Sequence, residues 1–127
     1  MKAFRLMMIL VLLVCAGSVW AAVADFAGAY TFVSRTIDGK PDMEGWGGTM
    51  EVKATTLSRH YSSADGTQTK FYDGTVTQEG DIYVVTFTAS HKPDYVGKVY
   101  RNHFALKDGT FTLTSEDGKF VEVWKKK

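Results

Sequence analysis

The sequence predicts an all-β protein, an antiparallel up-and-down barrel of about eight strands. Asp-Gly pairs recur at short intervals, and this dipeptide between strand-like runs is the strongest short-range signal of a β-hairpin. The intervening runs are rich in Thr, Val, Tyr and Phe, which favour strands. None of them repeats apolar residues at helical spacing. Closing a meander of this size into a barrel removes both exposed edges of the sheet.

The turn signals delimit eight strands. Asp73-Gly74 falls inside the fourth of them, where it predicts either a β-bulge or a second tight turn. The two longer connections are residues 39–48 and 90–97. The predicted strands are Ala29–Ile37, Thr49–Ala54, Leu57–Ser63, Thr67–Gln78, Ile82–Ala89, Lys98–Leu106, Thr110–Ser115 and Lys119–Lys125.

The first 24 residues have the three parts of a secretory signal peptide. Lys2 and Arg5 form a basic start, residues 6–14 an apolar run, and Ala22-Val23-Ala24 a small-x-small cleavage site. The apolar run is shorter than the roughly 20 residues that span a bilayer. We therefore predict cleavage after Ala24, a secreted or periplasmic domain of residues 25–127, and no transmembrane span.

Cys15 is the only cysteine, and it lies within the predicted signal peptide. Its position resembles that of the Cys in a bacterial lipoprotein box, where it would carry a lipid. Such boxes have a small residue before the Cys, and Val14 is not small, so the Ala-Val-Ala site is favoured over a lipid anchor. The mature domain then has no disulfide, no thiol nucleophile and no thiolate metal ligand.

The charge of the mature domain is close to neutral, since loss of Lys2 and Arg5 leaves 13 basic residues against 14 acidic ones. This balance offers no basic surface for a nucleic acid. Its histidines, His60, His91 and His103, do not have metal-ligand spacing, and no metal or other cofactor is predicted. No nucleophile elbow or phosphate-binding loop occurs, so no catalytic residue is assigned. We expect a monomer.

Alternation along each strand assigns an inward face, for which we take the more aromatic side. In the first strand this face holds Tyr30 and Phe32 together with Ser34 and Thr36. The last strand stays open, because Phe120 and Trp124 alternate with two valines. The inward aromatics either fill the barrel or line a cavity for a small apolar or amphipathic ligand. The candidate ligand-binding residues are Tyr30, Phe32, Trp46, Arg59, Tyr61, Tyr83, Phe87, Tyr100 and Phe104.

Two of these candidates carry alternative interpretations. Arg59 shares the inward face with Tyr61, where a guanidinium needs a partner. It is either an anchor for the polar head of a ligand, or stacked on an aromatic ring or paired with Glu122. Trp46, in a glycine-flanked loop, either contacts a ligand or partner or caps one end of the barrel.

Several segments resemble those of the lipocalin-like domains of bacteria, which are calycin-type small β-barrels. Residues 26–34 are similar to the opening Gly-x-Trp strand of that group, with Tyr30 in place of the Trp. Residues 90–97 resemble the loop before an Arg-containing strand, which makes Arg101 the corresponding Arg. Residues 104–114 resemble a hairpin of the group, and residues 123–125 resemble its closing strand.

The resemblance implies a calyx that binds a small hydrophobic or amphipathic molecule, with Arg101 sealing one end of the barrel. That role requires Arg101 to point inward, whereas the alternation places Tyr100 and Phe104 inward. The function that we expect is ligand binding or transport by an exported protein. The alternatives are an isomerase or cyclase in which Arg59, Tyr61 or His103 polarises a substrate, and a filled barrel that acts through its surface as an inhibitor or envelope partner.

Overall fold

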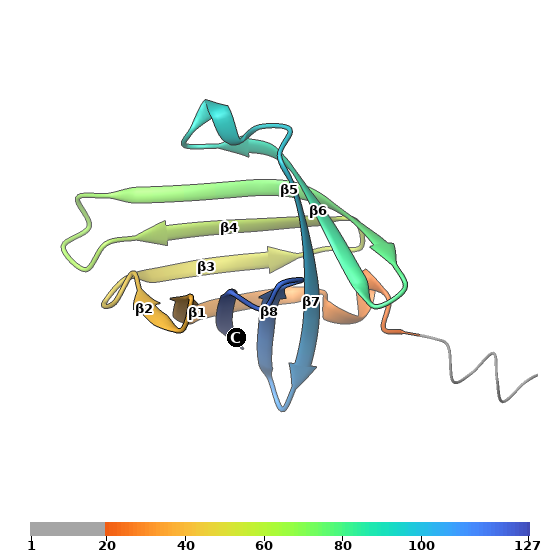
Figure 1. The fold of residues 1–127 in the computed structure, drawn as a ribbon. Helices are drawn as coiled ribbons and strands as arrows, with labels where there is room; N and C mark the ends of the chain where they lie inside the picture. Colours follow the sequence, from red (N-terminus) through yellow and green to blue (C-terminus); the bar gives the residue numbers. More distant parts are fainter. Residues whose placement is uncertain (1–19) are drawn as a thin grey trace, which may run out of the picture.

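The computed structural model describes residues 20–127, so most of the predicted signal peptide, including Cys15, lies outside the described residues. The described chain forms one antiparallel sheet in which neighbouring strands follow the order β2-β1-β3-β4-β5-β6-β7-β8-β9 (Figure 1). Two single turns of 3-10 helix, η1 (Val23–Phe26) and η2 (Pro93–Tyr95), precede β1 and β7. The strands are β1 (Gly28–Ile37), β2 (Lys40–Asp42), β3 (Gly47–Val52), β4 (Thr56–Ser62), β5 (Thr69–Glu79), β6 (Ile82–Ser90), β7 (Val99–Lys107), β8 (Thr110–Ser115) and β9 (Phe120–Lys126).

Pairing of β1 with β9 closes the sheet into a barrel. The barrel has eight strands, β1 and β3 to β9, as the sequence predicts, and β2 is a short addition that pairs only with the end of β1. The sequence predicts that the residues of β2 belong to the connection over residues 39–48. Asp38-Gly39 joins β1 to β2 with positive φ angles of 54° and 75°, and Asp108-Gly109 joins β7 to β8 with 52° and 77°. Two positive φ angles in a two-residue turn are the requirement of type I′, one of the two commonest turns of tight β-hairpins.

Two β-bulges change the alternation along their strands. The register of the β5–β6 pairing shifts between Asp73 and Gly74, so this dipeptide forms a β-bulge and not a second tight turn. The pairing of β1 with β9 shifts between Phe32 and Ser34, so Val33 is the extra residue. The prediction that Ser34 and Thr36 share the face of Phe32 is therefore wrong. Beyond the bulge Arg35 points inward and is buried.

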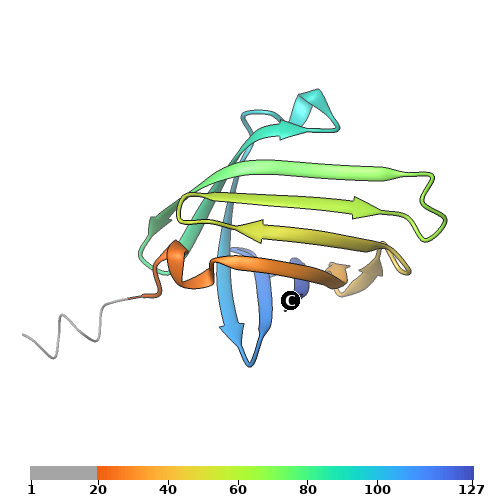
Figure 2. The same ribbon diagram turned by 180° about the vertical axis from the view of Figure 1, so that it is seen from behind.

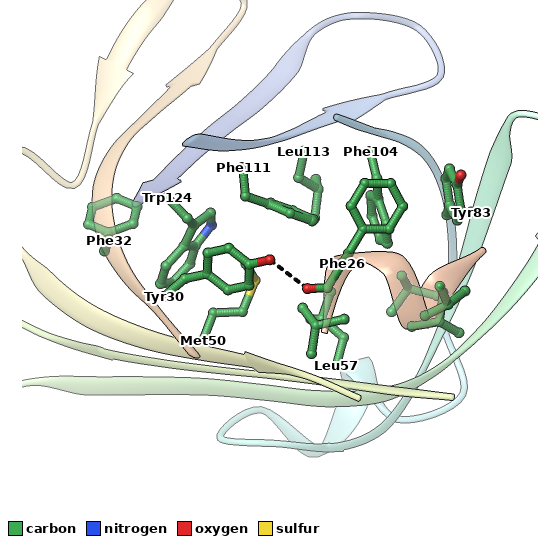
Figure 3. Close-up of a cluster of buried hydrophobic side chains, with 14 of the residues drawn as sticks. Phe26, Tyr30, Phe32, Met50, Leu57, Tyr83, Phe104, Phe111, Leu113 and Trp124 are labelled. Carbon is green, nitrogen blue, oxygen red and sulfur yellow. Dashed lines mark hydrogen bonds between the residues drawn. The ribbon is translucent and has the colours of Figure 1, made fainter. Parts of the chain in front are cut away.

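Aromatic side chains pack together inside the barrel at the end where η1 lies. In two opposite views η1 lies beside the turn between β5 and β6 (Figures 1 and 2). Its Phe26 inserts into the barrel and makes edge-to-face contacts with Tyr83, Phe104 and Phe111, at centroid distances of 5.4 to 5.6 Å (Figure 3). The hydroxyl of Tyr30 donates a 2.5 Å hydrogen bond to the carbonyl oxygen of Phe26. This end of the barrel is thus filled by side chains.

The inward direction that the alternation predicts for Tyr61, Tyr83, Phe87 and Phe104 is confirmed, because all four are buried in the core. Met50, Leu57 and Phe111 are buried beside them. The last strand, which the sequence left open, turns Phe120, Glu122 and Trp124 inward. None of the helices in residues 20–127 is long and apolar enough to cross a membrane.

Candidate functional site

A cavity of about 420 Å³ occupies the half of the barrel away from η1. Its position follows from β1, which begins next to η1 and ends at Ile37 on the cavity wall. Its aromatic wall is formed by Tyr72, Phe87, Tyr95, Tyr100 and Phe120. Val85 and Leu113 add aliphatic surface, and Arg35, Arg59 and Asn102 are polar groups on the same wall. The barrel is therefore filled at one end and hollow at the other.

Glu122 is fully buried between the packed half and the cavity, and it holds both arginines. Arg35 donates a hydrogen bond from Nε to Oε2 at 2.8 Å, and its Nη2 lies 2.7 Å from the same oxygen. Arg59 donates to Oε1 through Nη1 at 2.9 Å. Tyr61 donates its hydroxyl to Oε2 at 2.5 Å, and the indole N–H of Trp124 donates to Oε1 at 3.0 Å. These four hydrogen bonds occupy the roughly four acceptor sites of the carboxylate.

Strand geometry brings the members of this cluster together. Arg59 and Tyr61 lie two residues apart on β4, and Glu122 and Trp124 lie two apart on β9, so each pair shares the inward face. The bulge at Val33 puts Arg35 directly opposite Glu122 in the β1–β9 pairing. Without that extra residue, Ser34 would take the inward position.

The pKa shifts in the cluster keep every group in its ordinary charge state at neutral pH. Burial acts to raise the pKa of Glu122, but Arg59 and Arg35 outweigh it, so that pKa lies below its usual value. Burial acts to lower the pKa of Arg59, but Tyr61 and Glu122 outweigh it and raise that pKa. Burial raises the pKa of the Tyr61 phenol. None of these groups is brought near pH 7, where a general acid or base works best.

The loop that contains η2 forms part of the cavity wall. Tyr95 stacks on Tyr72 with a centroid distance of 5.9 Å and an interplanar angle of 20°. The ammonium groups of Lys92 and Lys98 lie 5.5 and 4.6 Å from the centre of the Tyr95 ring. This loop projects beyond the strands at the top of Figure 1. On this side the cavity wall is therefore formed by a connection and not by a strand.

The structure separates the sequence-derived candidate residues into two groups. Arg59, Phe87 and Tyr100 line the cavity. Tyr30, Phe32, Tyr61, Tyr83 and Phe104 instead belong to the packed core. Trp46 is half-buried against that core, with the Lys70 ammonium 5.2 Å from its ring centre, and it does not line this cavity.

The second interpretation of Arg59, a stack on an aromatic ring or a pair with Glu122, is confirmed, and the first, an anchor for a ligand, stays a prediction. Arg59 lines the cavity, as an anchor must. It also pairs with Glu122, and its Cζ lies 5.3 Å from the centre of the Tyr72 ring and 5.8 Å from that of Phe87.

Sequence reasoning missed Arg35, Tyr72 and Tyr95 as site residues and left the direction of Glu122 open. The bulge at Val33 gave no sequence signal that would turn Arg35 inward. The direction of Tyr72 could not be read from alternation, because a β-bulge follows it at Asp73-Gly74. Tyr95 lies in a connection, where alternation does not apply. Glu122 was named as the partner of a buried Arg59 in one of the two interpretations of that arginine, and the structure confirms the pair.

The sealing role that the resemblance implies for Arg101 is not present. Arg101 points outward, where it bonds to Glu79 and, through Nε at 3.1 Å, to Glu116. The face that the alternation assigns as inward in β7 is the correct one, because Asn102 and Phe104, on either side of His103, are buried. His103 lies on the outer side with Nδ1 3.7 Å from Asp81, away from the cavity.

The outer surface carries a Ser-His-Asp cluster that lacks the geometry of a catalytic triad. His60 Nε2 lies 3.0 Å from Ser58 Oγ and 3.5 Å from Asp73 Oδ1. Both contacts use the same ring nitrogen, so the carboxylate does not orient the ring from Nδ1 as a triad requires. Within residues 20–127 no group of three or more His, Cys, Asp or Glu side chains could hold a metal ion.

Comparison of the chain with models of protein families, with curated proteins and with solved structures gives no match. The closed antiparallel barrel of eight strands is consistent with a calycin-like fold.

Proposed function

We propose that this protein is an exported, lipocalin-like barrel that binds or carries a small amphipathic molecule in its cavity. The observation that carries the proposal is the cavity of about 420 Å³, which lies within the range typical of small-molecule sites. A mostly aromatic wall with a few convergent polar groups is also typical of such sites. The packing of Phe26 at the opposite end supports a single mouth on the side of Ile37 and Lys119.

Binding is tested with the neutral fluorophore N-phenyl-1-naphthylamine, whose emission rises in apolar surroundings. We expect saturable binding that Ile37→Trp weakens, because Ile37 lines the cavity near its mouth and a larger ring there fills it. Val33→Trp is the matched control, since Val33 lies on the same strand and is 54% exposed outside the cavity. Absence of binding, or equal weakening by the two variants, would contradict the proposal.

Export is tested by the mass of the protein recovered from the cell envelope or medium of a bacterial host expressing the full chain. A mass equal to residues 25–127 supports cleavage after Ala24 and a soluble mature domain. A lipid-modified mass that disappears in Cys15→Ser supports the anchored form instead. Retention of the full-length mass in the cytosol contradicts export in both forms.

A further inference from the structure

We infer that the ligand is an organic monoanion whose acidic head group, a carboxylate in the simplest case, accepts hydrogen bonds from the unpartnered Nε edge of the Arg59 guanidinium. This inference rests on the proposed function and names the class of ligand that the same cavity takes. It follows from how the two buried arginines share one carboxylate.

The two guanidinium groups differ in how much of their donor capacity is used. Arg35 gives Nε and Nη2 to Glu122, and its Nη1 lies 3.3 Å from Asp42 Oδ2, so all three of its nitrogens have an acceptor. Arg59 gives only Nη1 to Glu122. Its Nε is buried and has no hydrogen-bond partner among the described residues.

The unpartnered Nε defines an edge that fits an oxyanion. In a guanidinium, Nε–H and one N–H of Nη2 point the same way and match the two oxygens of a carboxylate. Glu122 cannot fill this edge, because its four hydrogen bonds and its contact with Arg35 Nη2 already use both of its oxygens. A buried donor without an acceptor is costly, and a ligand oxygen from the cavity would remove that cost.

The charge of the cluster favours one negative charge on the ligand. Arg35, Arg59 and Glu122 together carry a net charge of +1. Asp42 could offset it, but its side chain is 41% exposed, so water screens its contact with Arg35. A monoanion at Arg59 would neutralise the buried cluster, whereas a cationic ligand would add to its excess charge.

The rest of the cavity accounts for the apolar body of such a ligand. The rings of Tyr72 and Phe87 lie beside the Arg59 guanidinium, and Tyr95 and Tyr100 continue the aromatic wall. An acid bound at Arg59 would therefore place its apolar part along these rings. An acid and a neutral analogue with the same apolar body should therefore differ in affinity only through their head groups.

The test compares decanoate with decan-1-ol at pH 7.5 by calorimetric titration. We expect wild-type protein to bind decanoate at least about tenfold more tightly, as hydrogen bonds to a charged group predict. Arg59→Lys keeps the charge and can still pair with Glu122, but it lacks the two-donor edge. It should lose about tenfold or more in decanoate affinity and stay within about twofold for decan-1-ol.

Arg101→Lys is the matched control, because it is the same substitution at an arginine that pairs with Glu79 and Glu116 on the outer surface and does not line the cavity. It should change decanoate affinity by less than about threefold, since it leaves the cavity and the buried cluster untouched. Equal affinity of wild-type protein for the acid and the alcohol, or equal loss of both in Arg59→Lys, would overturn the inference and leave the proposed function standing. Failure of both compounds and of the neutral fluorophore to bind would overturn the proposed function itself.

A measurement on the wild-type protein keeps the test decisive if Arg59→Lys does not fold. The Nε–H resonance of Arg59 in a proton–nitrogen correlation spectrum reports directly on a new acceptor. We expect decanoate to shift this resonance and decan-1-ol to leave it nearly unchanged. A resonance that neither compound moves, under conditions where decanoate binds, would overturn the inference.

Discussion

Arg35 and Glu122 lie directly opposite each other on β1 and β9, and two donors of the guanidinium meet the same carboxylate oxygen at 2.8 and 2.7 Å. These two strands close the barrel, so the ion pair spans its seam. Glu122 also holds Arg59 and Tyr61 of β4 across the interior. One buried carboxylate thus ties the closing strands to the opposite wall and supports the floor of the cavity.

Replacement Glu122→Gln should destabilise the fold strongly. The amide keeps the shape of the side chain, but it leaves the buried Arg59 guanidinium without its counter-charge and Arg35 with only the half-exposed Asp42. Breaking a buried pair in this way costs about 3–5 kcal/mol. The free energy of unfolding in urea measures the loss. Glu116→Gln is the control, since Glu116 pairs with Arg101 on the exposed surface, where such a change costs less than about 1 kcal/mol. Similar losses in the two variants would contradict the role of Glu122.

Stability should fall in acid partly because Glu122 must be protonated. Burial acts to raise the pKa of Glu122, but Arg59 and Arg35 hold it below the ordinary value of 4.5. Between these two pKa values the unfolded chain binds a proton that the folded protein does not, so stability decreases as the pH falls below about 4.5. Above that value the contribution of Glu122 is constant.

The pH effect is isolated by comparing wild-type protein with Glu122→Gln in urea at several values between pH 7 and pH 3. Asp65 and Asp117 also have lowered pKa values, through hydrogen bonds from Ser63 and Ser115 first of all, and they contribute equally in both proteins. The stability difference between the two proteins should therefore shrink below about pH 4.5. A difference that is independent of pH would show that the Glu122 pKa is not lowered.

The architecture of the barrel could be predicted from sequence because its signals are local. The turns at Asp38-Gly39 and Asp108-Gly109 need residues that tolerate positive φ, and Asp-Gly supplies them. Alternation in β4 then placed Arg59 and Tyr61 on the inward face correctly. Such rules act within a few residues, so one sequence is enough to apply them.

The site could be predicted only in part, because it depends on departures from regular alternation. The extra residue at Val33 turns Arg35 inward, and nothing in the run Thr31-Phe32-Val33-Ser34 distinguishes a bulge from a regular strand. Whether the inward aromatic side chains fill the barrel depends on how far η1 reaches into it. Phe26 fills one half of the barrel, and no local pattern sets that depth.

Gly74→Ala should destabilise the bulge in β5. An added Cβ there would lie 2.7 Å from the carbonyl oxygen of Thr86 and 3.0 Å from a methyl group of Val85, so the backbone of β6 must move. Such overpacking costs about 1–3 kcal/mol. Gly47→Ala is the control, because its φ is not positive and its Cβ would meet no atom within 4 Å. Its unfolding free energy should change by less than about 1 kcal/mol. An equal effect of the two substitutions would show that the bulge accommodates a side chain.

The residues before the predicted cleavage site should affect the stability of the protein, because they pack on the barrel. Val23 is buried, Ala22 N–H donates to Asp25 Oδ2 at 2.8 Å, and the Ala21 carbonyl accepts hydrogen bonds from Gln78 and Tyr83. A protein of residues 22–127 keeps Val23 in the core, and its amino group can form an ion pair with Asp25. A protein of residues 25–127 loses both.

We expect residues 22–127 to be more stable than residues 25–127 by about 1.5–3 kcal/mol, the gain from burying one valine side chain. Urea unfolding of the two proteins measures the difference. Val23→Ala in the longer protein should reproduce much of the loss, since it removes the buried side chain and keeps the chain length. Equal stabilities would mean that residues 22–24 contribute little, and cleavage after Ala24 would then leave the barrel intact at no measurable cost.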